Sequence, residues 1–406
     1  MRNDEVIGAM NVIIVNDFAY INGGAGMVAI NTAKLLAEHG HKVILFTAVG
    51  PIDSDLIHRN NLKVICLNQC DILNDPNRLR AVVQGIWNKK AEKFMKKILN
   101  GMSPADTIIH IHTLSKAISS SIIPAIKQKE FKIVYHVHDY GVVCPNMGFF
   151  NYRLNKMCSQ KAMSWKCIFS NCDSRCYAHK IWRVIRQKIQ NIYLTKNVDG
   201  FIFVSEFSKK ILKSYIADGA VISNPLLTNK KKFIDVVQNK CALYIGRLSK
   251  EKNPLLLAQA AKQLNIPVIF VGDGECRRNI RDINPNAIIT GWLNRDDMWK
   301  YISEARYLVF PSILYETQGM VVGEMASYGI PAIVSDSSAA TDFVIDEKNG
   351  LWFKNANLES LKTAMRRLED NEFLATLSKA SYEKLEFSQE AYINCIERYY
   401  ETILRQ

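Results

Sequence analysis

The first half of the chain alternates short apolar runs with stretches whose apolar residues recur every three to four positions. Residues 11–15 form the first run, a glycine turn follows, and residues 27–39 show the helical period before a second run at 41–49. Further apolar runs lie at 107–111, 132–137 and 200–204, with helical stretches such as 88–99 between them. Strands that alternate with helices are typical of a parallel, doubly wound sheet, so we expect an α/β domain here.

The alternation begins again in the second half, after a polar stretch at 228–239 that contains three consecutive lysines and predicts a linker. The predicted strands lie at 242–245, 268–271, 288–290, 307–310 and 332–334, and the predicted helices at 254–264, 295–304 and 320–328. The tail, 358–404, predicts two or three amphipathic helices. We therefore expect two α/β domains, 1–225 and 226–406, with a ligand site in the cleft between them.

The net charge of +13 changes this picture because it is unevenly distributed. Residues 226–406 carry equal numbers of basic and acidic residues, so the whole positive excess lies in residues 1–225. A basic face attracts phosphate-rich partners such as anionic lipid head groups or nucleic acid, although a solvated basic surface is the simpler alternative. No nucleic-acid-binding motif is recognisable, so we expect an anionic membrane surface as a partner and no nucleic acid.

The sequence does not predict a membrane span. No apolar run approaches the ~18 residues that a span requires. The first ten residues include Arg2, Asp4 and Glu5, which does not fit the pattern of a signal peptide. We expect a cytoplasmic protein that is held peripherally on the inner face of the cytoplasmic membrane.

The glycine turn at 22–26 lies between the first predicted strand and the first predicted helix. Gly24 lets backbone N–H groups approach an anion there, and the N-terminus of the helix adds a favourable dipole. Residues 24–29 also fit a relaxed dinucleotide-binding pattern. A dehydrogenase would need an acidic residue at the end of the second strand, however, and residues 47–49 are Thr, Ala and Val. A purely structural turn is the remaining interpretation.

In the second domain, Arg247 and Lys252 stand five residues apart in the loop after the first strand. A guanidinium fork and a compact ammonium can hold a diphosphate together. They would neutralise the charge that grows on a nucleotide leaving group without a metal ion. Two solvated surface cations are the alternative, and this loop taken alone favours them.

The segment 310–324 contains two glutamates eight residues apart, on either side of a glycine turn that begins a helix. Glu316 precedes the turn and Glu324 lies two helical turns later, so both can reach one ligand from different ends. The N–H groups of Gly319, Met320 and Val321 would suit an anion or sugar hydroxyls.

Together these segments resemble the retaining glycosyltransferases of family 4 (glycosyl transferases group 1), which have the GT-B fold of two facing Rossmann-like domains. The E-x7-E motif is matched by Glu316 and Glu324, and the G-R-x-x-x-x-K motif by residues 246–252. Further segments match in the family's order and extend the resemblance over nearly the whole chain: 204–208, 222–225, 271–274 and 328–331. One departure is Thr317 and Gln318, where the family more often has an aromatic residue before the glycine.

The resemblance implies a role for each matched position. Glu316 would contact hydroxyls of the donor sugar as the catalytic glutamate, and Glu324 would bind the donor's ribose. Arg247 and Lys252 would hold the diphosphate, which Gly24 would approach from the opposite domain. No metal or cofactor is implied for catalysis.

The resemblance also gives a role to His138, which follows the predicted strand 132–137 and would lie beside the reacting anomeric carbon; a turn cap is the alternative. We expect transfer from a UDP- or GDP-sugar to a growing, lipid-linked cell-surface glycan, such as an O-antigen, capsule or exopolysaccharide unit. A small soluble acceptor and a non-catalytic sugar-nucleotide-binding protein are the alternatives. We also expect the final helix to pack back toward the first domain.

A basic stretch at about 144–190, rich in aromatic residues and cysteines, is interpreted as an insertion in the first domain. Such residues together suit a lipid head-group surface or a phosphorylated acceptor. A few of its basic residues on one face would hold the enzyme at a membrane: Lys156, Lys161, Lys166, Arg175, Lys180, Arg183, Arg186 and Lys188.

Four cysteines of the insertion, Cys144, Cys158, Cys167 and Cys172, could form a closed tetrahedral zinc site that folds it. A chain without a recognisable export signal favours thiols or metal ligands over disulfides. The spacings differ from the CxxC pairs of standard zinc motifs, so unligated thiols are the alternative.

Overall fold

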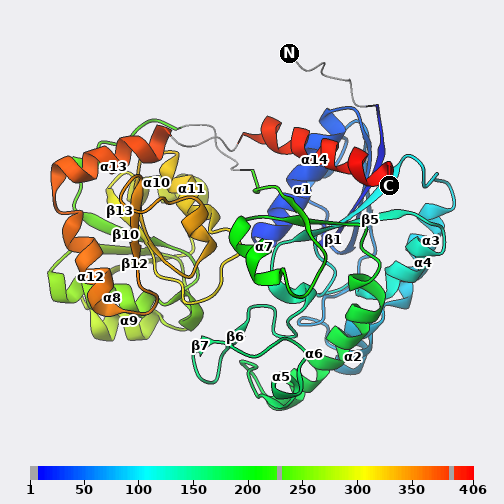
Figure 1. Cartoon of the computed structure of the whole chain (residues 1–406), viewed down its shortest axis with the longest axis horizontal. Helices are drawn as coiled ribbons and strands as arrows, with labels where there is room; N and C mark the ends of the chain where they lie inside the picture. Colours follow the sequence, from blue (N-terminus) through cyan, green and yellow to red (C-terminus); the bar gives the residue numbers. More distant parts are fainter. Residues whose placement is uncertain (1–7, 226–230, 384–387) are drawn as a thin grey trace.

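A computed structural model of the chain describes residues 8–225, 231–383 and 388–406, and it divides them into two lobes (Figure 1). Each lobe contains one parallel sheet flanked by helices. The predicted α/β class with two parallel sheets is therefore confirmed.

The first lobe is built on seven strands in the order β3-β2-β1-β4-β5-β8-β9. Every neighbouring pair is parallel, so the chain must cross over between strands, and the crossovers supply the helices. The strands are β1 (Asn11–Phe18), β2 (Lys42–Val49), β3 (Leu62–Cys66), β4 (Thr107–Ile111), β5 (Lys132–Val137), β8 (Gly200–Phe203) and β9 (Gly219–Val221).

Both faces of this sheet are buried, because successive side chains of a strand point to opposite sides and both sets are apolar. Ile13 and Val15 of β1 belong to one core cluster, and Val12 and Ile14 belong to another. Helices α3 (Lys89–Leu99) and α4 (Ile123–Lys127) cover the first face, whereas α1 (Gly24–Glu38) covers the second. The other helices of this lobe are α2 (Arg78–Ile86), α5 (Trp165–Phe169), α6 (Tyr177–Gln190) and α7 (Glu206–Leu212).

The last helix of the chain, α14 (Gln389–Leu404), packs on the first lobe although it follows the second lobe in sequence (Figure 1). Its residues Tyr392, Ile396 and Tyr400 are buried in the same core cluster as α1. The hydroxyl groups of Tyr392 and Thr32 share a hydrogen bond of 2.7 Å that joins α14 to α1.

The second lobe has six strands in the order β12-β11-β10-β13-β14-β15, all parallel to their neighbours. They are β10 (Cys241–Ile245), β11 (Val268–Val271), β12 (Ile288–Gly291), β13 (Ala305–Phe310), β14 (Ala332–Ser335) and β15 (Gly350–Phe353). The helices are α8 (Pro254–Leu264), α9 (Arg277–Ile283), α10 (Arg295–Ile302), α11 (Met320–Ala326), α12 (Leu358–Arg367) and α13 (Asn371–Glu383).

Apart from the short hairpin of the insertion, three described strands are not predicted from the sequence, and each has a weak pattern. Strand β3 lies at the edge of its sheet and includes the exposed Lys63, β9 has only three residues, and β15 begins at the glycine of an Asn-Gly pair. The stretch predicted as a linker, 228–239, is partly core: Val236 is buried in the second lobe, with Ile234 and Val237 packed beside it. Residues 228–230 of that stretch lie outside the described residues.

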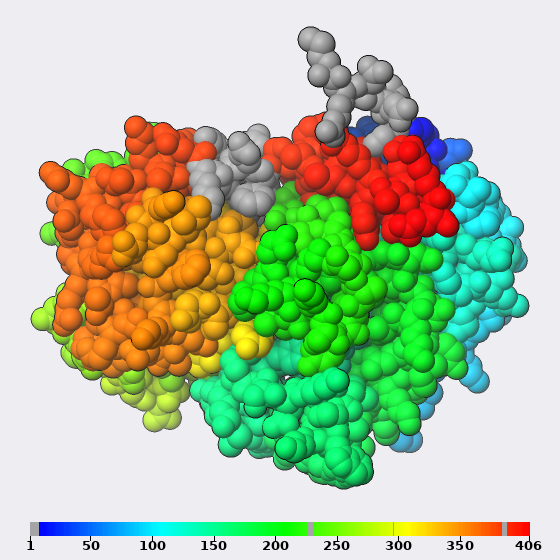
Figure 2. All heavy atoms as spheres, in the orientation of Figure 1, coloured from blue at the N-terminus to red at the C-terminus, as the bar shows by residue number. Residues whose placement is uncertain are grey.

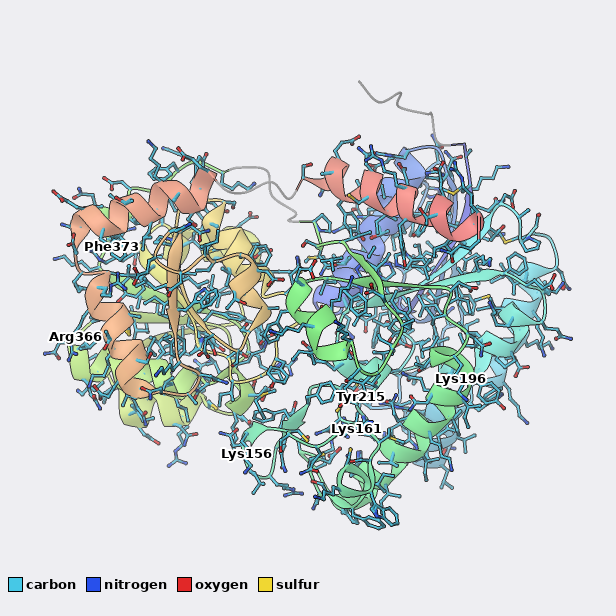
Figure 3. All side chains as sticks on the ribbon, in the orientation of Figure 1. Lys156, Lys161, Lys196, Tyr215, Arg366 and Phe373 are labelled. Carbon is cyan, nitrogen blue, oxygen red and sulfur yellow. The ribbon has the colours of Figure 1, made fainter. Side chains whose placement is uncertain are left out.

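The insertion projects from the first lobe below the level of both sheets (Figures 1 and 2). It contains a small antiparallel hairpin, β6 (Phe150–Asn151) and β7 (Lys156–Met157), followed by α5 and α6. Figure 3 places Lys156 on the hairpin, on the side of the insertion toward the second lobe. Among the residues that the structure describes, no helix combines the length and apolar character needed to cross a bilayer.

Three of the eight basic residues from which a membrane-binding face is predicted are not exposed. Lys180 and Arg186 are buried, and Arg183 forms an ion pair with the buried Asp173 at 3.0 Å. The exposed members are Lys156, Lys161, Lys166, Arg175 and Lys188.

Candidate active site

Glu316 lies in the loop between β13 and α11, where it meets a second predicted donor-site residue. Its carboxylate forms an ion pair with Lys252 and accepts a hydrogen bond of 2.6 Å from the Ser312 hydroxyl. The side chain of Glu316 is 13% exposed and that of Lys252 is 28% exposed, so the pair is accessible to a ligand. The charge of Glu316 also reaches the buried Tyr140 of the first lobe, whose pKa is raised by burial and by this carboxylate.

Arg247 and Lys252 lie in the loop that follows β10, and close backbone packing fixes this loop. The Leu248 N–H donates to the Asp273 carbonyl oxygen at 2.9 Å, which ties the loop to the Gly-Asp-Gly turn after β11. A Cβ atom on Gly272 would lie 2.0 Å from the Gly246 carbonyl oxygen, so only glycine fits. The loop thus presents the Arg247 side chain, which is exposed, from a rigid backbone.

The loop that carries Glu316 is also bound to the first lobe, by the two residues that depart from the family pattern. The Thr317 hydroxyl donates to the His138 carbonyl oxygen at 2.8 Å. The Ser205 hydroxyl donates to the Thr317 carbonyl oxygen at 2.5 Å, and the Asn224 amide donates to the Gln318 side-chain oxygen at 2.5 Å. These bonds hold Glu316 in a fixed position relative to the first lobe.

The first turns of two helices meet where the lobes face each other. Gly24 begins α1 and Met320 begins α11; a Cβ atom on Gly24 would lie 4.0 Å from the Met320 sulfur. Gly319 caps α11 in the left-handed conformation, with φ of 75°. Backbone N–H groups in the first turn of a helix have no partner within that helix. The structure therefore brings Gly24, Gly319, Met320 and Val321 together, with the partly buried Glu324 one turn further along α11.

His138 belongs to a group of four histidines, which we call the histidine array: His110, His112, His136 and His138. The array follows from the period of two along β4 and β5, which places i and i+2 side chains on one face of the sheet. The His112 Nδ1 and His138 Nε2 atoms are 2.8 Å apart, and His110 Nδ1 is 2.6 Å from the Tyr400 hydroxyl of α14. The rings of His136 and His138 stack with their centres 4.3 Å apart, and His136 bonds to His110, so the array connects His138 to Tyr400 of α14.

Burial keeps the histidine array uncharged. It lowers the pKa of His110 and of His138 to about 3, and it lowers the pKa of His112 and His136 well below the usual value. One ring nitrogen each of His110, His112 and His136 lies within 4.8 Å of the others, which is close enough for a metal ion. Both ring nitrogens of His110 already have partners, however, in Tyr400 and His136. The array therefore consists of two hydrogen-bonded pairs of stacked rings, one of which holds the His138 ring.

The four cysteines predicted to bind zinc gather around a lysine. The ammonium of the buried Lys180 lies 3.3 Å from the Cys172 sulfur and 3.7 Å from the Cys167 sulfur. Burial alone would lower the pKa of Lys180, but these two thiols raise it, and Cys144 adds to their effect. Within the described part of the chain, no three of these sulfurs lie within 4.8 Å of one another. The zinc site stays a prediction, and binding would require Lys180 to move.

A sequence profile named Glycosyltransferase Family 4 matches residues 22–229, just over half of the chain, and this segment contains Gly24 and His138. The chain belongs to Glycosyltransferase Family 4. A second profile, Glycosyl transferases group 1, matches residues 228–384 of this glycosyltransferase, which contain Arg247, Lys252 and Glu316. The predicted family is confirmed.

The glycosyltransferase has a distant relative of known name in Escherichia coli. It is 28% identical over 171 residues to the UDP-Gal:alpha-D-GlcNAc-diphosphoundecaprenol alpha-1,3-galactosyltransferase of Escherichia coli. That match covers 38% of this chain and 43% of the relative, so it spans less than half of that protein.

Two solved structures resemble the whole chain. Sucrose-phosphate synthase of Thermosynechococcus elongatus has a TM-score of 0.73 at 21% identity, covering 98% of this chain and 99% of that one. The Anabaena protein HepE in complex with UDP has a TM-score of 0.68 at 15% identity, covering 97% and 100%. At these identities the likeness shows the fold alone, and the predicted GT-B fold is confirmed.

The sequence does not predict the hydrogen bonds that support the site, although Ser205 and Asn224 lie in segments that match the family. Ser312 bonds to Glu316, Ser205 and Asn224 bond to the loop after it, and His112 bonds to His138. A signal existed for His112, because His-x-His occurs at the end of two successive strands. The bonds between the lobes join residues about 90 to 180 positions apart, so local pattern carries no trace of them.

Proposed function

We propose that the glycosyltransferase is a retaining, metal-independent enzyme that moves a sugar from a UDP- or GDP-sugar to a lipid-linked cell-surface glycan, such as an O-antigen, capsule or exopolysaccharide unit. It would act in the cytoplasm at the inner face of the cytoplasmic membrane. The observation that carries the proposal is the ion pair between Lys252 and Glu316. The loop that contains Glu316 is also hydrogen-bonded, through Thr317, to the backbone of His138. Residues proposed to bind a diphosphate and a sugar would then lie near the residue proposed to face the anomeric carbon.

We propose that donor binding replaces the ion pair between Lys252 and Glu316 with a contact from each of these residues to the donor. In this structure the Lys252 charge is balanced by Glu316. A nucleoside diphosphate would offer Lys252 and the exposed Arg247 a more highly charged partner. Glu316 would then be released to accept hydrogen bonds from hydroxyls of the donor sugar. Because two protein cations neutralise the leaving diphosphate, the reaction needs no divalent metal.

The remaining donor contacts are proposed from the positions that meet at the lobe boundary. The N–H groups of Gly319, Met320 and Val321 would approach the donor from one lobe and those near Gly24 from the other. Glu324, one turn further along α11, would accept hydrogen bonds from the ribose hydroxyls.

His138 is proposed to act as a neutral imidazole beside the anomeric carbon. Its lowered pKa, a result of burial, means that it can donate or accept a hydrogen bond without introducing a positive charge. Its bond to His112 fixes the orientation of the ring.

The acceptor class is proposed from the charge of the first lobe and from the relative in Escherichia coli, whose name specifies an acceptor on diphosphoundecaprenol. The test is turnover with UDP-galactose, UDP-glucose and GDP-mannose in EDTA, with and without an undecaprenyl-diphosphate-linked sugar. We expect one donor to be consumed faster when the lipid-linked acceptor is present. Faster transfer to a free sugar than to the lipid-linked one would contradict the proposed acceptor.

A further inference from the structure

A cavity of about 370 Å³ opens in the first lobe between α2 and α6. Ser115 and Lys116, which follow β4, form part of its wall, as does Met147, which follows β5. The Met147 carbonyl oxygen accepts a hydrogen bond of 3.2 Å from the Tyr140 N–H, so the cavity borders the segment that begins at His138. It therefore lies near the carboxyl ends of β4 and β5, the edge of a parallel sheet where ligands bind.

Positive charge is concentrated in this cavity, whose lining includes Arg78, Lys116, Arg175, Arg183 and Arg186. Asp173 pairs with Arg183 at 3.0 Å. As far as the structure describes the chain, the other four cations form no ion pair, although Asp17 and Asp139 lie within electrostatic range of Arg186 and Lys116, and Asp75 within that of Arg78. An excess of cations in a concave, partly apolar site attracts an anion.

Arg186 has an unused donor at the wall of the cavity. Its side chain is 8% exposed, and its guanidinium lies 5.0 Å from the centre of the Trp182 ring. One terminal nitrogen donates to the Ser115 carbonyl oxygen at 3.1 Å, but the buried Nε atom has no hydrogen-bond partner. A buried donor on a charged group is normally paired, so the Arg186 guanidinium is under-satisfied here, and an anion in the cavity that it lines would stabilise its charge. Burial and the neighbouring Arg183 also lower the pKa of Arg186 to about 10, which an anion would reverse.

Apolar residues line part of the cavity, and others are exposed on the same two helices. Val82 and Trp182 line it, and a hydrogen bond of 3.2 Å from the Trp182 indole to the Val82 carbonyl oxygen joins α2 to α6. Outside it, Leu79 is 81% exposed on α2, and Ile181 and Ile185 are 46% and 48% exposed on α6. Figure 1 shows α2 and α6 side by side. Exposed apolar residues on adjoining helices indicate a surface that another apolar group covers.

We propose that this cavity binds the phosphate or diphosphate of a lipid-linked acceptor, whose hydrocarbon chain leaves over the exposed apolar residues of α2 and α6. The inference rests on the proposed function, since it names where the acceptor of that reaction is held. Neither half of the site alone would select such a molecule: the arginines bind the anion, and the apolar border distinguishes a lipid-borne diphosphate from a free one.

The test is calorimetric titration with farnesyl diphosphate, inorganic pyrophosphate and farnesyl alcohol. We expect farnesyl diphosphate to bind at least tenfold more tightly than either of the other two. The double variant Arg78→Gln/Arg175→Gln removes two exposed charges of the cavity, and we expect it to weaken farnesyl diphosphate binding at least tenfold. The matched control is Lys93→Gln/Lys97→Gln on α3, which removes the same charge from exposed positions outside the cavity and should change nothing.

A third variant separates this cavity from the proposed donor site. Arg247→Ala should leave farnesyl diphosphate binding unchanged, whereas loss of binding would show that the diphosphate occupies the donor loop and would overturn the inference. Equal affinity for pyrophosphate and farnesyl diphosphate, or an unchanged affinity in the Arg78→Gln/Arg175→Gln variant, would overturn it as well. The Arg78→Gln/Arg175→Gln variant should bind nucleotide as tightly as the wild-type protein does. A wild-type protein that binds farnesyl diphosphate but no nucleotide would contradict the proposed function and leave the cavity assignment standing.

Discussion

The histidine array determines how the protein responds to acid. An unfolded histidine has a pKa of about 6.5, whereas burial lowers the pKa of His110 to about 3. Between these values the unfolded chain binds a proton at His110 and the folded chain does not. The contribution to stability is therefore complete above pH 6.5 and is lost as the pH falls toward 3.

The size of the effect follows from the gap between the two pKa values. Each pH unit below 6.5 costs about 1.4 kcal/mol for a histidine that stays neutral when folded, so His110 costs about 2 kcal/mol at pH 5. The buried His112 and His136 act in the same direction, and so does His138, whose pKa is lowered as far as that of His110. Native proteins are stable by about 5–15 kcal/mol, so the array should remove a large share of that margin by pH 5.

The assay is urea unfolding at pH 7, 6 and 5, followed by circular dichroism. In His110→Gln one titrating group is gone, so the loss of unfolding free energy between pH 7 and pH 5 should shrink by about 2 kcal/mol relative to wild type. The control is His58→Asn, because His58 is exposed and asparagine tolerates its positive φ of 63°. The reasoning is refuted if wild type is equally stable at pH 7 and pH 5, or if His110→Gln and wild type lose the same free energy.

Three further predictions concern the site and the insertion. Glu316→Gln should lower turnover more than nucleotide affinity, and Glu324→Ala should lower nucleotide affinity more than turnover. Enzyme kinetics and calorimetric titration with the nucleotide alone measure the two effects, and equal effects in both variants would contradict the assigned roles. Thr317→Val removes the hydrogen bond to the His138 carbonyl oxygen, so it should lower kcat several-fold with little change in nucleotide affinity. An unchanged kcat would show that this bond does not position Glu316. Metal analysis of protein purified without added zinc should find about one zinc per chain, and Cys158→Ser should lose both this zinc and stability. Metal-free protein with an intact fold would contradict the zinc site and would mean that the sulfurs contact Lys180 instead.

The sequence predicts most of this fold because the strands of both sheets are short, apolar and regularly separated by amphipathic helices. Helix 254–264 and strands 107–111 and 132–137 lie where the pattern puts them. Helix α1 begins at Gly24, three residues before the predicted start, because glycine and alanine give no apolar period there. Strand β3 is not predicted because it lies at the edge of the sheet, where none of its residues is buried.

Motif spacing in the candidate site finds the residues that would touch the donor but not those that position them. Lys252 and Glu316 are both predicted site residues, but they are 64 positions apart in the sequence. A local sequence pattern therefore cannot predict that they form an ion pair. Thr317 and Gln318 differ from the family's common residues, and only the structure shows that they bind the first lobe. Lys180 and Arg186 illustrate the opposite error, since a basic run implies exposure but helix α6 turns both side chains inward.

The central claim is that protein cations in the second lobe hold the diphosphate of a nucleotide-sugar donor without a metal ion. Calorimetric titration of UDP and GDP in the presence of EDTA tests it most directly, with wild type compared with Arg247→Ala. Removing one partner of a charge-assisted contact costs about 1.5–3 kcal/mol, so the account predicts that one nucleotide binds wild type in EDTA and that Arg247→Ala weakens this binding at least tenfold. Binding that requires a divalent metal and is unchanged in Arg247→Ala would contradict the account.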